Sequence, residues 1–415
     1  YWKVSYLLIL LISIIGNYFL GVLLSKMEAK PRKNQYLIAG VIINLCTLGY
    51  YKYADFFIDN LHWITGDNYS SLSIYLPLAI SFFTFQQIAY LIDASKGEAK
   101  EYSFVHYCLF ISFFPQLIAG PIVHHKEMLP QFAKEETYKL NSENIAIGFT
   151  VFFIGLFKKV VIADTFSKWA ELGFDSDKVL NAAEAWTTSL SYTFQLYFDF
   201  SGYTDMAIGL ALLFNIKLPI NFNSPYKAIN IQDFWRRWHI TLSRFLRDYI
   251  YIPLGGNRKG SFCTASNLMA TFVLGGIWLG AGWTFIFWGV LHGLALIIHR
   301  FWNQLGVKLW PWFSWLITFN FINISWVFFR AKGWSDAIKV LESMFSFDNI
   351  MLPNGFKNKL LNLEKYQIQY GDWLSALHAD KWTVLLILIT ILCVLKSRNS
   401  MQIASAFKTN KYYCA

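Results

Sequence analysis

Residues 4–24 decide the class of fold. They read VSYLLILLISIIGNYFLGVLL and contain no charged residue. About 20 mostly apolar residues are enough for an α-helix to cross the hydrocarbon core of a bilayer. The sequence therefore predicts a membrane-spanning helix close to the start of this chain.

Apolar runs of the same kind recur along the rest of the sequence. They cover residues 36–58, 72–92, 104–123, 145–163, 186–200 with 206–214, 268–277, 283–301, 309–329 and 382–395. Together with the first run they give about ten membrane-embedded segments. Several are short or are interrupted by glycine and polar residues, which a bilayer tolerates only where the backbone is buried in protein or lines a cavity. We expect an all-α, polytopic membrane bundle with broken and re-entrant helices.

The composition excludes a water-soluble protein. Of the 415 residues, 55% are hydrophobic and only 15% are charged, whereas soluble domains carry about 25% charged residues. The long apolar runs also exclude a lipid-facing β-barrel, whose strands would alternate between apolar and polar residues. In a membrane protein, the net charge of +10 indicates cytoplasmic loops and contact with anionic headgroups. We therefore expect membrane lipids as partners and no nucleic acid.

The most basic part of the chain is residues 227–259. It holds seven basic residues (Lys227, Arg236, Arg237, Arg244, Arg247, Arg258 and Lys259) against Asp233 and Asp248, so seven minus two gives +5. Because cytoplasmic loops carry an excess of Lys and Arg, this block is predicted to lie at the cytoplasmic face.

Residues 231–254, which read IQDFWRRWHITLSRFLRDYIYIPL, form the most informative part of that block. At about 100° per residue, Trp235 and Trp238 share an apolar arc, and His239 falls at its edge. The opposite arc carries Arg236, Arg237, Arg244 and Arg247. An amphipathic helix of this kind is typical of a membrane-surface anchor. Alternatively, the Arg cluster binds a polyanionic donor such as coenzyme A, beside Trp235 and Trp238.

Other polar residues in apolar surroundings are candidates for a site. Asp199, Ser201, Tyr203 and Asp205 are too polar to face lipid, so they should line an interior cavity or hold a helix broken at Ser201–Gly202. Acid–base chemistry and structural capping both remain open for the two carboxylates. His292 lies within an apolar run and is a weaker candidate. No metal-ligand spacing occurs, so we expect no metal and no tightly bound cofactor.

Two long motifs resemble the membrane-bound O-acyltransferase family. They are FWRRWHITLSRFLRDYIYIPLGGNRKG at 234–260 and YFDFSGYTDMAIGLALLFNIKLPINFNSPY at 197–226. SFFTFQQIAYLID at 81–93, FFPQLIAGPIV at 113–123 and GLFKKVVIADT at 155–165 fit as well. The resemblance covers most of the chain and is strongest to the membrane subunit of alginate O-acetyltransferases.

The resemblance implies a conical bundle around a central funnel in the cell (cytoplasmic or inner) membrane. It also implies an acyl donor such as acetyl-CoA or an acyl carrier protein on the cytoplasmic side. The acceptor would be a hydroxyl of a cell-envelope polysaccharide, or an extracytoplasmic partner protein that carries the acyl group. Relatives begin earlier, with a further membrane helix, and end later. Residues 1–415 are therefore expected to form a single domain truncated at both ends.

One departure from the family pattern affects the chemistry. The family's catalytic His lies in a Trp-His-Gly motif, which reads Trp278-Leu279-Gly280 here, whereas His239 and His292 match the family. Leucine cannot accept a proton, and loss of a general base costs about 10²–10⁴ in rate. We expect an O-acyltransferase that uses acetyl or another small acyl group. The alternatives are an inactive member acting as scaffold or acyl conduit, and D-alanyl transfer to a wall polymer. A secondary transporter is disfavoured, because the sequence shows no repeated halves.

Overall fold

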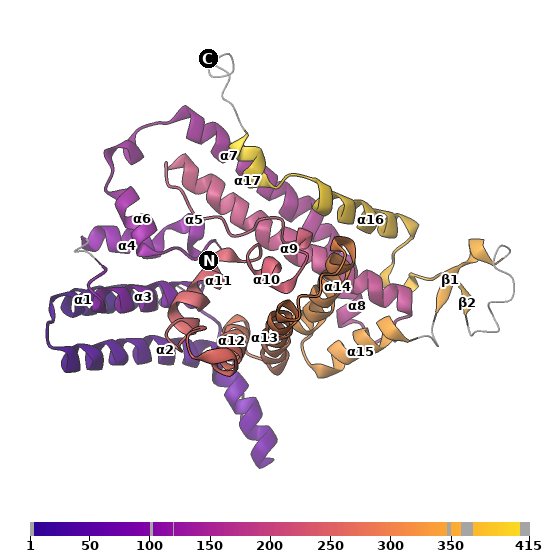
Figure 1. Cartoon of the computed structure of the whole chain (residues 1–415), viewed down its shortest axis with the longest axis horizontal. Coiled ribbons are helices and arrows are strands. Elements are labelled where there is room, and N and C mark those ends of the chain that lie inside the picture. Colours follow the sequence, from indigo (N-terminus) through magenta and orange to yellow (C-terminus); the bar gives the residue numbers. More distant parts are fainter. Residues whose placement is uncertain (1–3, 100–102, 119, 347–349, 358–367, 407–415) are drawn as a thin grey trace. The chain divides into compact units, whose positions relative to one another are not determined.

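The computed structural model describes residues 4–99, 103–118, 120–346, 350–357 and 368–406. Helices dominate this part of the chain (Figure 1). The first seven are α1 Ser5–Lys26, α2 Lys30–Thr65, α3 Ile80–Ser95, α4 Phe104–Ser112, α5 Phe114–Leu117, α6 His125–Phe132 and α7 Ser142–Phe157. A π-helical segment, Lys158–Ala163, joins α7 to α8 Asp164–Asp175. The remaining helices are α9 Ala182–Leu213, α10 Ile231–Trp235, α11 Ile240–Leu246, α12 Gly260–Leu279, α13 Trp283–Gln304, α14 Pro311–Arg330, α15 Trp334–Phe345, α16 Lys381–Lys396 and α17 Ser400–Ser405.

A small extended element interrupts the helices late in the chain. Strands β1 Met351–Pro353 and β2 Gln369–Gly371 pair in parallel, with Leu352 opposite Tyr370. Both strands lie in the polar stretch between α15 and α16. This two-stranded sheet is the only sheet among the described residues.

The described chain divides into two units. The first unit comprises Tyr1–Phe153, Thr204–Ile220 and Ala406–Ala415. Its helices α1, α2 and α3 pack together around a buried polar network. Asn17 donates to the Gln87 side chain at 2.5 Å, and Asn44 donates to the Asn17 side chain at 2.7 Å. Such bonds hold helices together in a bilayer, where lipid tails weaken the hydrophobic drive for helices to associate.

The second unit comprises Ile154–Tyr203 and Asn221–Ser405. Its core is rich in buried aromatic side chains, among them Phe194, Tyr226, Phe234, Trp235, Trp238, Trp288 and Trp326. Helices α12 and α13 approach closely through glycine. A Cβ at Gly276 would lie 2.4 Å from the Phe285 carbonyl oxygen, and one at Gly289 would lie 2.4 Å from the Phe272 carbonyl oxygen. Small residues therefore set the spacing of these two helices.

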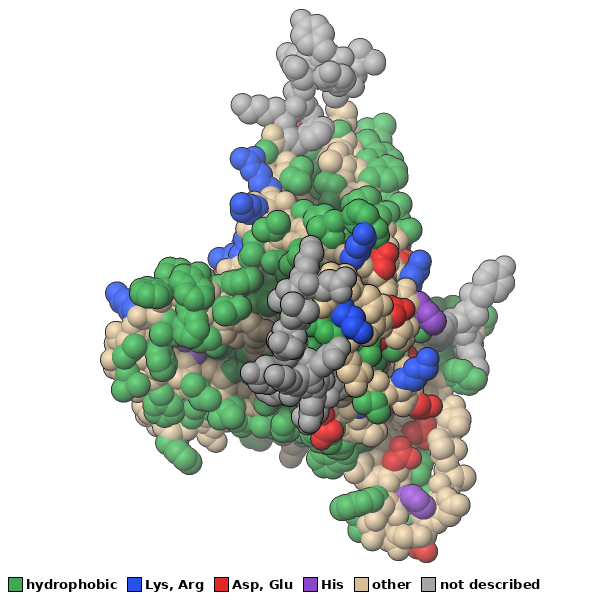
Figure 2. All heavy atoms as spheres, turned by 90° about the vertical axis from the view of Figure 1, so that its right-hand side faces the viewer, with side chains coloured by type: hydrophobic (Ala, Val, Ile, Leu, Met, Phe, Trp, Pro, Cys, Tyr) green, Lys and Arg blue, Asp and Glu red, His purple; other side chains and the backbone are tan. Residues whose placement is uncertain are grey.

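Six of the expected segments lie in helices long and apolar enough to cross a membrane. Among the described residues these are Tyr6–Lys26, Lys30–Thr65, Ser142–Asp175, Gly260–Leu279, Trp283–Gln304 and Pro311–Arg330. The other predicted membrane-embedded segments do not lie in helices of this kind among the described residues. Helices α3, α4 and α16 are too short, and α9 is long enough but too polar. Hydrophobic side chains cover much of the face drawn in Figure 2, as contact with lipid requires.

The predicted helix break at Ser201–Gly202 is wrong. Helix α9 runs without interruption from Ala182 to Leu213. A Cβ at Gly202 would lie 2.7 Å from the Gly155 carbonyl oxygen. The glycine therefore allows another backbone to approach, and it does not end the helix.

Candidate active site

The segment 231–254 is not the single amphipathic helix that its periodicity predicts. Helix α10 ends at Trp235, and α11 begins only at Ile240. His239 between them has φ 42° and ψ 54°, a left-handed conformation that non-glycine residues seldom adopt. Residues Arg247–Tyr251 then form a π-helical turn. The break turns His239 inward, to 3% exposure, and away from the polar edge of a helix.

The environment of His239 fixes which ring nitrogen carries its proton. Nδ1 of His239 lies 3.0 Å from the side-chain oxygen of Asn221, which also accepts hydrogen bonds from the backbone and the hydroxyl of Thr241. Because that oxygen can only accept, Nδ1 of His239 must donate. The other nitrogen, Nε2, has no hydrogen-bond partner among the described residues and carries a lone pair.

His239 lies outside the six candidate spans, and burial lowers its pKa to about 3. The imidazole is therefore neutral at ordinary pH. Its ring lies edge-on to Phe200, with 4.8 Å between the centroids. A neutral, positioned imidazole with one available lone pair can accept a proton, and its low pKa makes it a weaker base than a free imidazole.

His292, on α13, is arranged differently. Trp235 donates to its Nδ1 at 3.2 Å, so Nε2 must carry the proton. Nε2 lies 3.1 Å from the hydroxyl of Ser325, which in turn donates to the Ile322 carbonyl oxygen at 2.8 Å. Both ring nitrogens are thus engaged by the protein, and His292 joins α10, α13 and α14 inside the aromatic core.

Leu279 is the last residue of α12 and is partly buried. It packs against the aromatic core of the second unit. The next residue, Gly280, starts a tight turn, where a Cβ would lie 2.3 Å from the Phe285 ring. The position at which the resemblance implies a catalytic His is thus filled here by an apolar side chain.

A basic cavity of about 850 Å³ opens beside the broken segment. Trp235, Arg236, Arg244 and Arg247, all predicted donor-binding residues, line it. The structure places Arg237 and Trp238 elsewhere. Arg237 pairs with Asp233 at 2.8 Å, and Trp238 stacks on Phe234 in the core. His239 lines neither this cavity nor the apolar one between α13 and α14, although its neighbour Ile240 lines the basic cavity.

Two basic residues that line the basic cavity were not predicted from the sequence. Arg300 and His299 reach it from the last turns of α13. Nε of Arg300 is buried and has no partner among the described residues, so an anionic ligand could satisfy it. The sequence signal that could have indicated this site is Arg300, a charged residue near the end of the apolar run 283–301.

The acidic residues of α9 do not gather in either cavity. The Lys159 ammonium lies 2.7 Å from carboxylate oxygens of both Asp164 and Asp199. Ser201 is buried at 1% exposure and Tyr203 is half-buried. Asp205 belongs to the first unit and is also buried. Asp199 therefore has a structural ion-pair role here, and the prediction that these residues line a cavity finds no support in the two cavities described.

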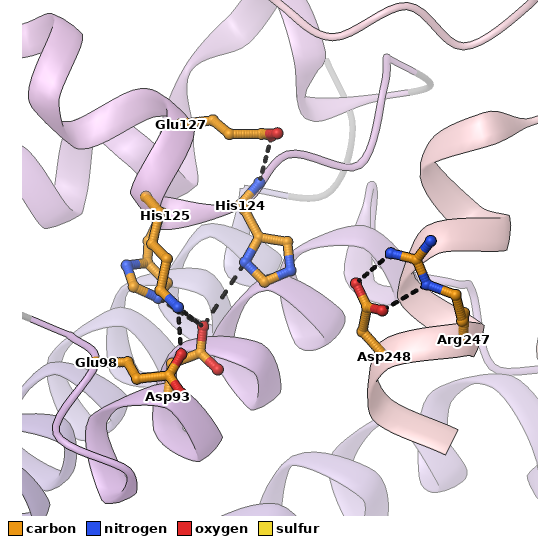
Figure 3. Close-up of polar contacts among 8 residues, drawn as sticks. Asp93, Glu98, His124, His125, Glu127, Arg247 and Asp248 are labelled. Carbon is orange, nitrogen blue, oxygen red and sulfur yellow. Dashed lines mark hydrogen bonds and ion pairs between the residues drawn. The ribbon is translucent and has the colours of Figure 1, made fainter. Parts of the chain in front are cut away.

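Three residues of the first unit could share a cation. Ligand atoms of Asp93, His124 and His125 lie within 4.8 Å of one another, and His125 Nε2 lies 2.9 Å from the Asp93 carboxylate (Figure 3). The Lys126 ammonium lies 3.7 Å from the same oxygen. Burial raises the pKa of Asp93, but the bond from His125 and the neighbouring positive charges outweigh it, so the pKa is lowered. Lys126 supplies the positive charge that a metal would bring.

Sequence comparison relates the chain to known proteins. The membrane-bound O-acyltransferase family model matches residues 42–333. The chain is 49% identical to a peptidoglycan O-acetyltransferase of Helicobacter pylori, over 97% of this chain and 82% of that protein. It is 41% identical to a probable alginate O-acetylase of Pseudomonas aeruginosa, over 88% and 71%. A teichoic acid D-alanyltransferase of Bacillus subtilis is 30% identical, over 61% and 69%.

The family model covers all five motifs that resemble the family, from within α2 to just past the end of α14. It therefore also covers the broken segment at His239 and the basic cavity. The relatives match over nearly the whole chain. This multi-pass membrane protein belongs to the membrane-bound O-acyltransferase family.

Proposed function

We propose that this chain transfers an acetyl group from a cytoplasmic donor toward hydroxyls of peptidoglycan outside the membrane. The observation that carries the proposal is the 49% identity, over 97% of the chain, to a peptidoglycan O-acetyltransferase. Alginate is the second candidate acceptor, supported at 41% identity. D-alanyl transfer has weaker support, because that relative matches 61% of the chain at 30% identity.

In the proposed reaction, the basic cavity holds the anionic part of the donor, such as acetyl-CoA or an acyl carrier protein. Arg236, Arg244 and Arg247 line it, and Nε of Arg300 is available for an anion. Guanidinium groups bind phosphate with paired hydrogen bonds, which favours a phosphate-bearing donor. The acyl group would then reach an acceptor handled outside through a central funnel, directly or through an extracytoplasmic partner protein.

His239 is the proposed general base. The acceptor hydroxyl oxygen attacks the thioester carbonyl carbon while its proton passes to Nε2 of His239. The carbon–sulfur bond then breaks, and the departing thiolate takes up that proton. The geometry favours His239 over His292, because Nε2 of His239 has a lone pair available and both nitrogens of His292 are engaged.

The presence of Leu279 favours a second candidate, an inactive member that serves as a scaffold or acyl conduit. The deciding experiment measures O-acetyl groups on peptidoglycan, released by mild base, in cells with and without this chain. The first proposal expects the acetyl content to fall on deletion and to return with the gene. An unchanged content, in cells whose peptidoglycan is acetylated, would support the scaffold.

Donor binding has a matched pair of variants. Arg244→Ala removes a cavity-lining guanidinium, so we expect a raised KM for the donor. Arg237→Ala removes a neighbouring guanidinium that pairs with Asp233 outside the cavity, so KM should change little. Equal effects of the two variants would count against the basic cavity as the donor site.

The side of the membrane can be tested directly. Asn257 is exposed and lines the basic cavity. In a background without native cysteines, a cysteine at Asn257 should react with an impermeant maleimide only when the cytoplasmic face is accessible. Labelling from outside intact cells would overturn the proposed entry side.

A further inference from the structure

A second cavity of the second unit, of about 600 Å³, lies between α13 and α14. One stripe of α13 (Leu291, Ala295, Ile298 and Trp302) faces Ile317 and Phe321 of α14 across it. These two helices are neighbours in Figure 1. The cavity is open, and Ile298 and Ile317 on its rim are 56% and 49% exposed, so it is a groove on the lipid-facing surface.

The length of the groove matches one leaflet. From Leu291 to Trp302 the helix rises roughly 16 Å, at 1.5 Å per residue. That is about half of the 30 Å hydrocarbon core of a bilayer. The apolar stripe therefore has the length of one lipid tail lying along α13.

One end of the groove is polar and cationic. Lys308, His299 and Asn303 line it there. Trp302 donates to the Val307 carbonyl oxygen at 2.9 Å and so holds the turn that carries Lys308. Trp310 and Trp312, next in the chain, are 72% and 60% exposed. Exposed tryptophans gather at the headgroup level of membranes, which places the cationic end of the groove at that level.

The cationic end also belongs to the side predicted to be cytoplasmic. Arg300 lies in the last turns of α13 and Lys308 follows that helix at this end. The start of α12 follows Arg258 and Lys259. The cytoplasmic leaflet carries the anionic lipids to which such residues are attracted.

We propose that the α13–α14 groove binds one anionic phospholipid of the cytoplasmic leaflet. Its acyl chain lies along Ala295 and Ile298, and its phosphate meets Lys308. Ile229 and Ile231 also line the groove. Ile231 starts α10, which precedes the break at His239. The bound lipid thus supports the segment that carries the candidate base.

The test uses the purified full chain in detergent and native mass spectrometry. Phosphatidylglycerol and phosphatidylcholine with the same tails are added separately. We expect the chain to retain one phosphatidylglycerol more tightly than phosphatidylcholine. Lys308→Ala should weaken this retention about fivefold, the contribution of one lysine beside an anionic lipid. Ala295→Phe fills the middle of the groove and should abolish retention.

Two matched controls separate this groove from other basic surfaces. Lys178→Ala removes an exposed lysine of the same unit far along the chain, and Arg244→Ala removes a guanidinium of the basic cavity only. Neither should change retention of phosphatidylglycerol. Glycerol phosphate should not compete, because it lacks the tail.

Three outcomes would overturn the proposal: equal retention of the two lipids, equal effects of Lys308→Ala and Lys178→Ala, or undiminished binding by a folded Ala295→Phe variant. If Ala295→Phe does not fold, the exposed Lys308→Ala change still decides the outcome. A neutral lipid or a detergent molecule would then be the better-supported occupant.

Discussion

His239 and His292 lie in the same unit, both among aromatic rings and both almost fully buried. They differ in what surrounds their nitrogens. His239 stands at a left-handed break between α10 and α11, with one nitrogen held by Asn221 and the other without a partner among the described residues. His292 lies in the middle of α13, with Trp235 on one nitrogen and Ser325 on the other.

The difference separates a chemical role from a structural one. A buried imidazole with both nitrogens bonded gains stability from each bond and has no lone pair to accept a proton. One with a single bond is oriented but still reactive, and the strained backbone that presents it is typical of functional sites. Burial alone therefore does not distinguish the two histidines, but hydrogen-bond geometry does.

The largest expected effect is on transfer by His239→Asn. Asparagine tolerates the left-handed backbone but cannot act as the base. We expect acetyl transfer to fall about 10²–10⁴-fold with the fold retained. The rate is measured as labelled acetyl delivered to the native polymer by membranes. It is measured in the unchanged chain if that turns over, and otherwise in a Leu279→His background. Unchanged transfer would remove His239 from the mechanism.

His292→Leu should affect stability more than chemistry. It leaves the buried Trp235 indole N–H without its acceptor, while the Ser325 hydroxyl keeps its bond to the Ile322 carbonyl oxygen. We therefore expect a loss of about 1–3 kcal/mol in the free energy of unfolding. Unfolding in detergent by chemical denaturant measures this loss, with His239→Asn as the comparison. If the His292→Leu protein were stable but had lost acetyl transfer, His292 would be the better candidate for the base and His239 would be structural.

Acid should weaken the fold through His239. Its pKa is about 3 in the fold and 6.5 in the unfolded chain, so the unfolded state takes up a proton first as the pH falls. The contribution of neutral His239 to the free energy of unfolding is fully present above pH 6.5 and is lost as the pH falls toward 3. Between pH 7 and pH 5, the loss amounts to about 2 kcal/mol. The His239→Asn variant should lack this acid-dependent loss of stability, which denaturant unfolding at pH 7 and pH 5 measures. If the variant and the unchanged protein lost equal stability in acid, the buried, neutral state of His239 would be contradicted.

The smallest expected effect is a gain. Leu279→His introduces the residue that the resemblance implies at this partly buried position. Leucine and histidine are similar enough in size for the packing to tolerate either. We expect transfer to rise at least about tenfold. Leu279→Gln, polar but unable to act as a base, is the matched control and should give no gain. A native rate that Leu279→His does not improve would leave His239 as the sufficient base and end the inactive-member hypothesis.

The sequence predicted the fold class better than the details of the site. Apolar runs located the long helices α1, α2, α12, α13 and α14, because a bilayer requires length and hydrophobicity that composition alone reveals. It failed at 231–254 and at Ser201–Gly202. In residues 231–254 the apolar residues keep a helical spacing although the helix is broken at His239. At Ser201–Gly202 the glycine suggested a break, but α9 is continuous. The spacing of residues within one segment does not show which other part of the backbone packs against it.

By itself the sequence determined that this is a multi-pass membrane protein with the motifs of its family, among them the segment that contains His239. Only the tertiary structure decided which residues meet. Asn221 orients His239 across 18 residues of chain, and Ser325 engages His292 across 33. The tertiary structure also places Arg244 in the lining of the basic cavity, whereas Arg237 pairs with Asp233. The reason is physical: a side chain's reactivity depends on the lone pairs and charges its neighbours leave available, and folding brings those neighbours together from distant parts of the chain.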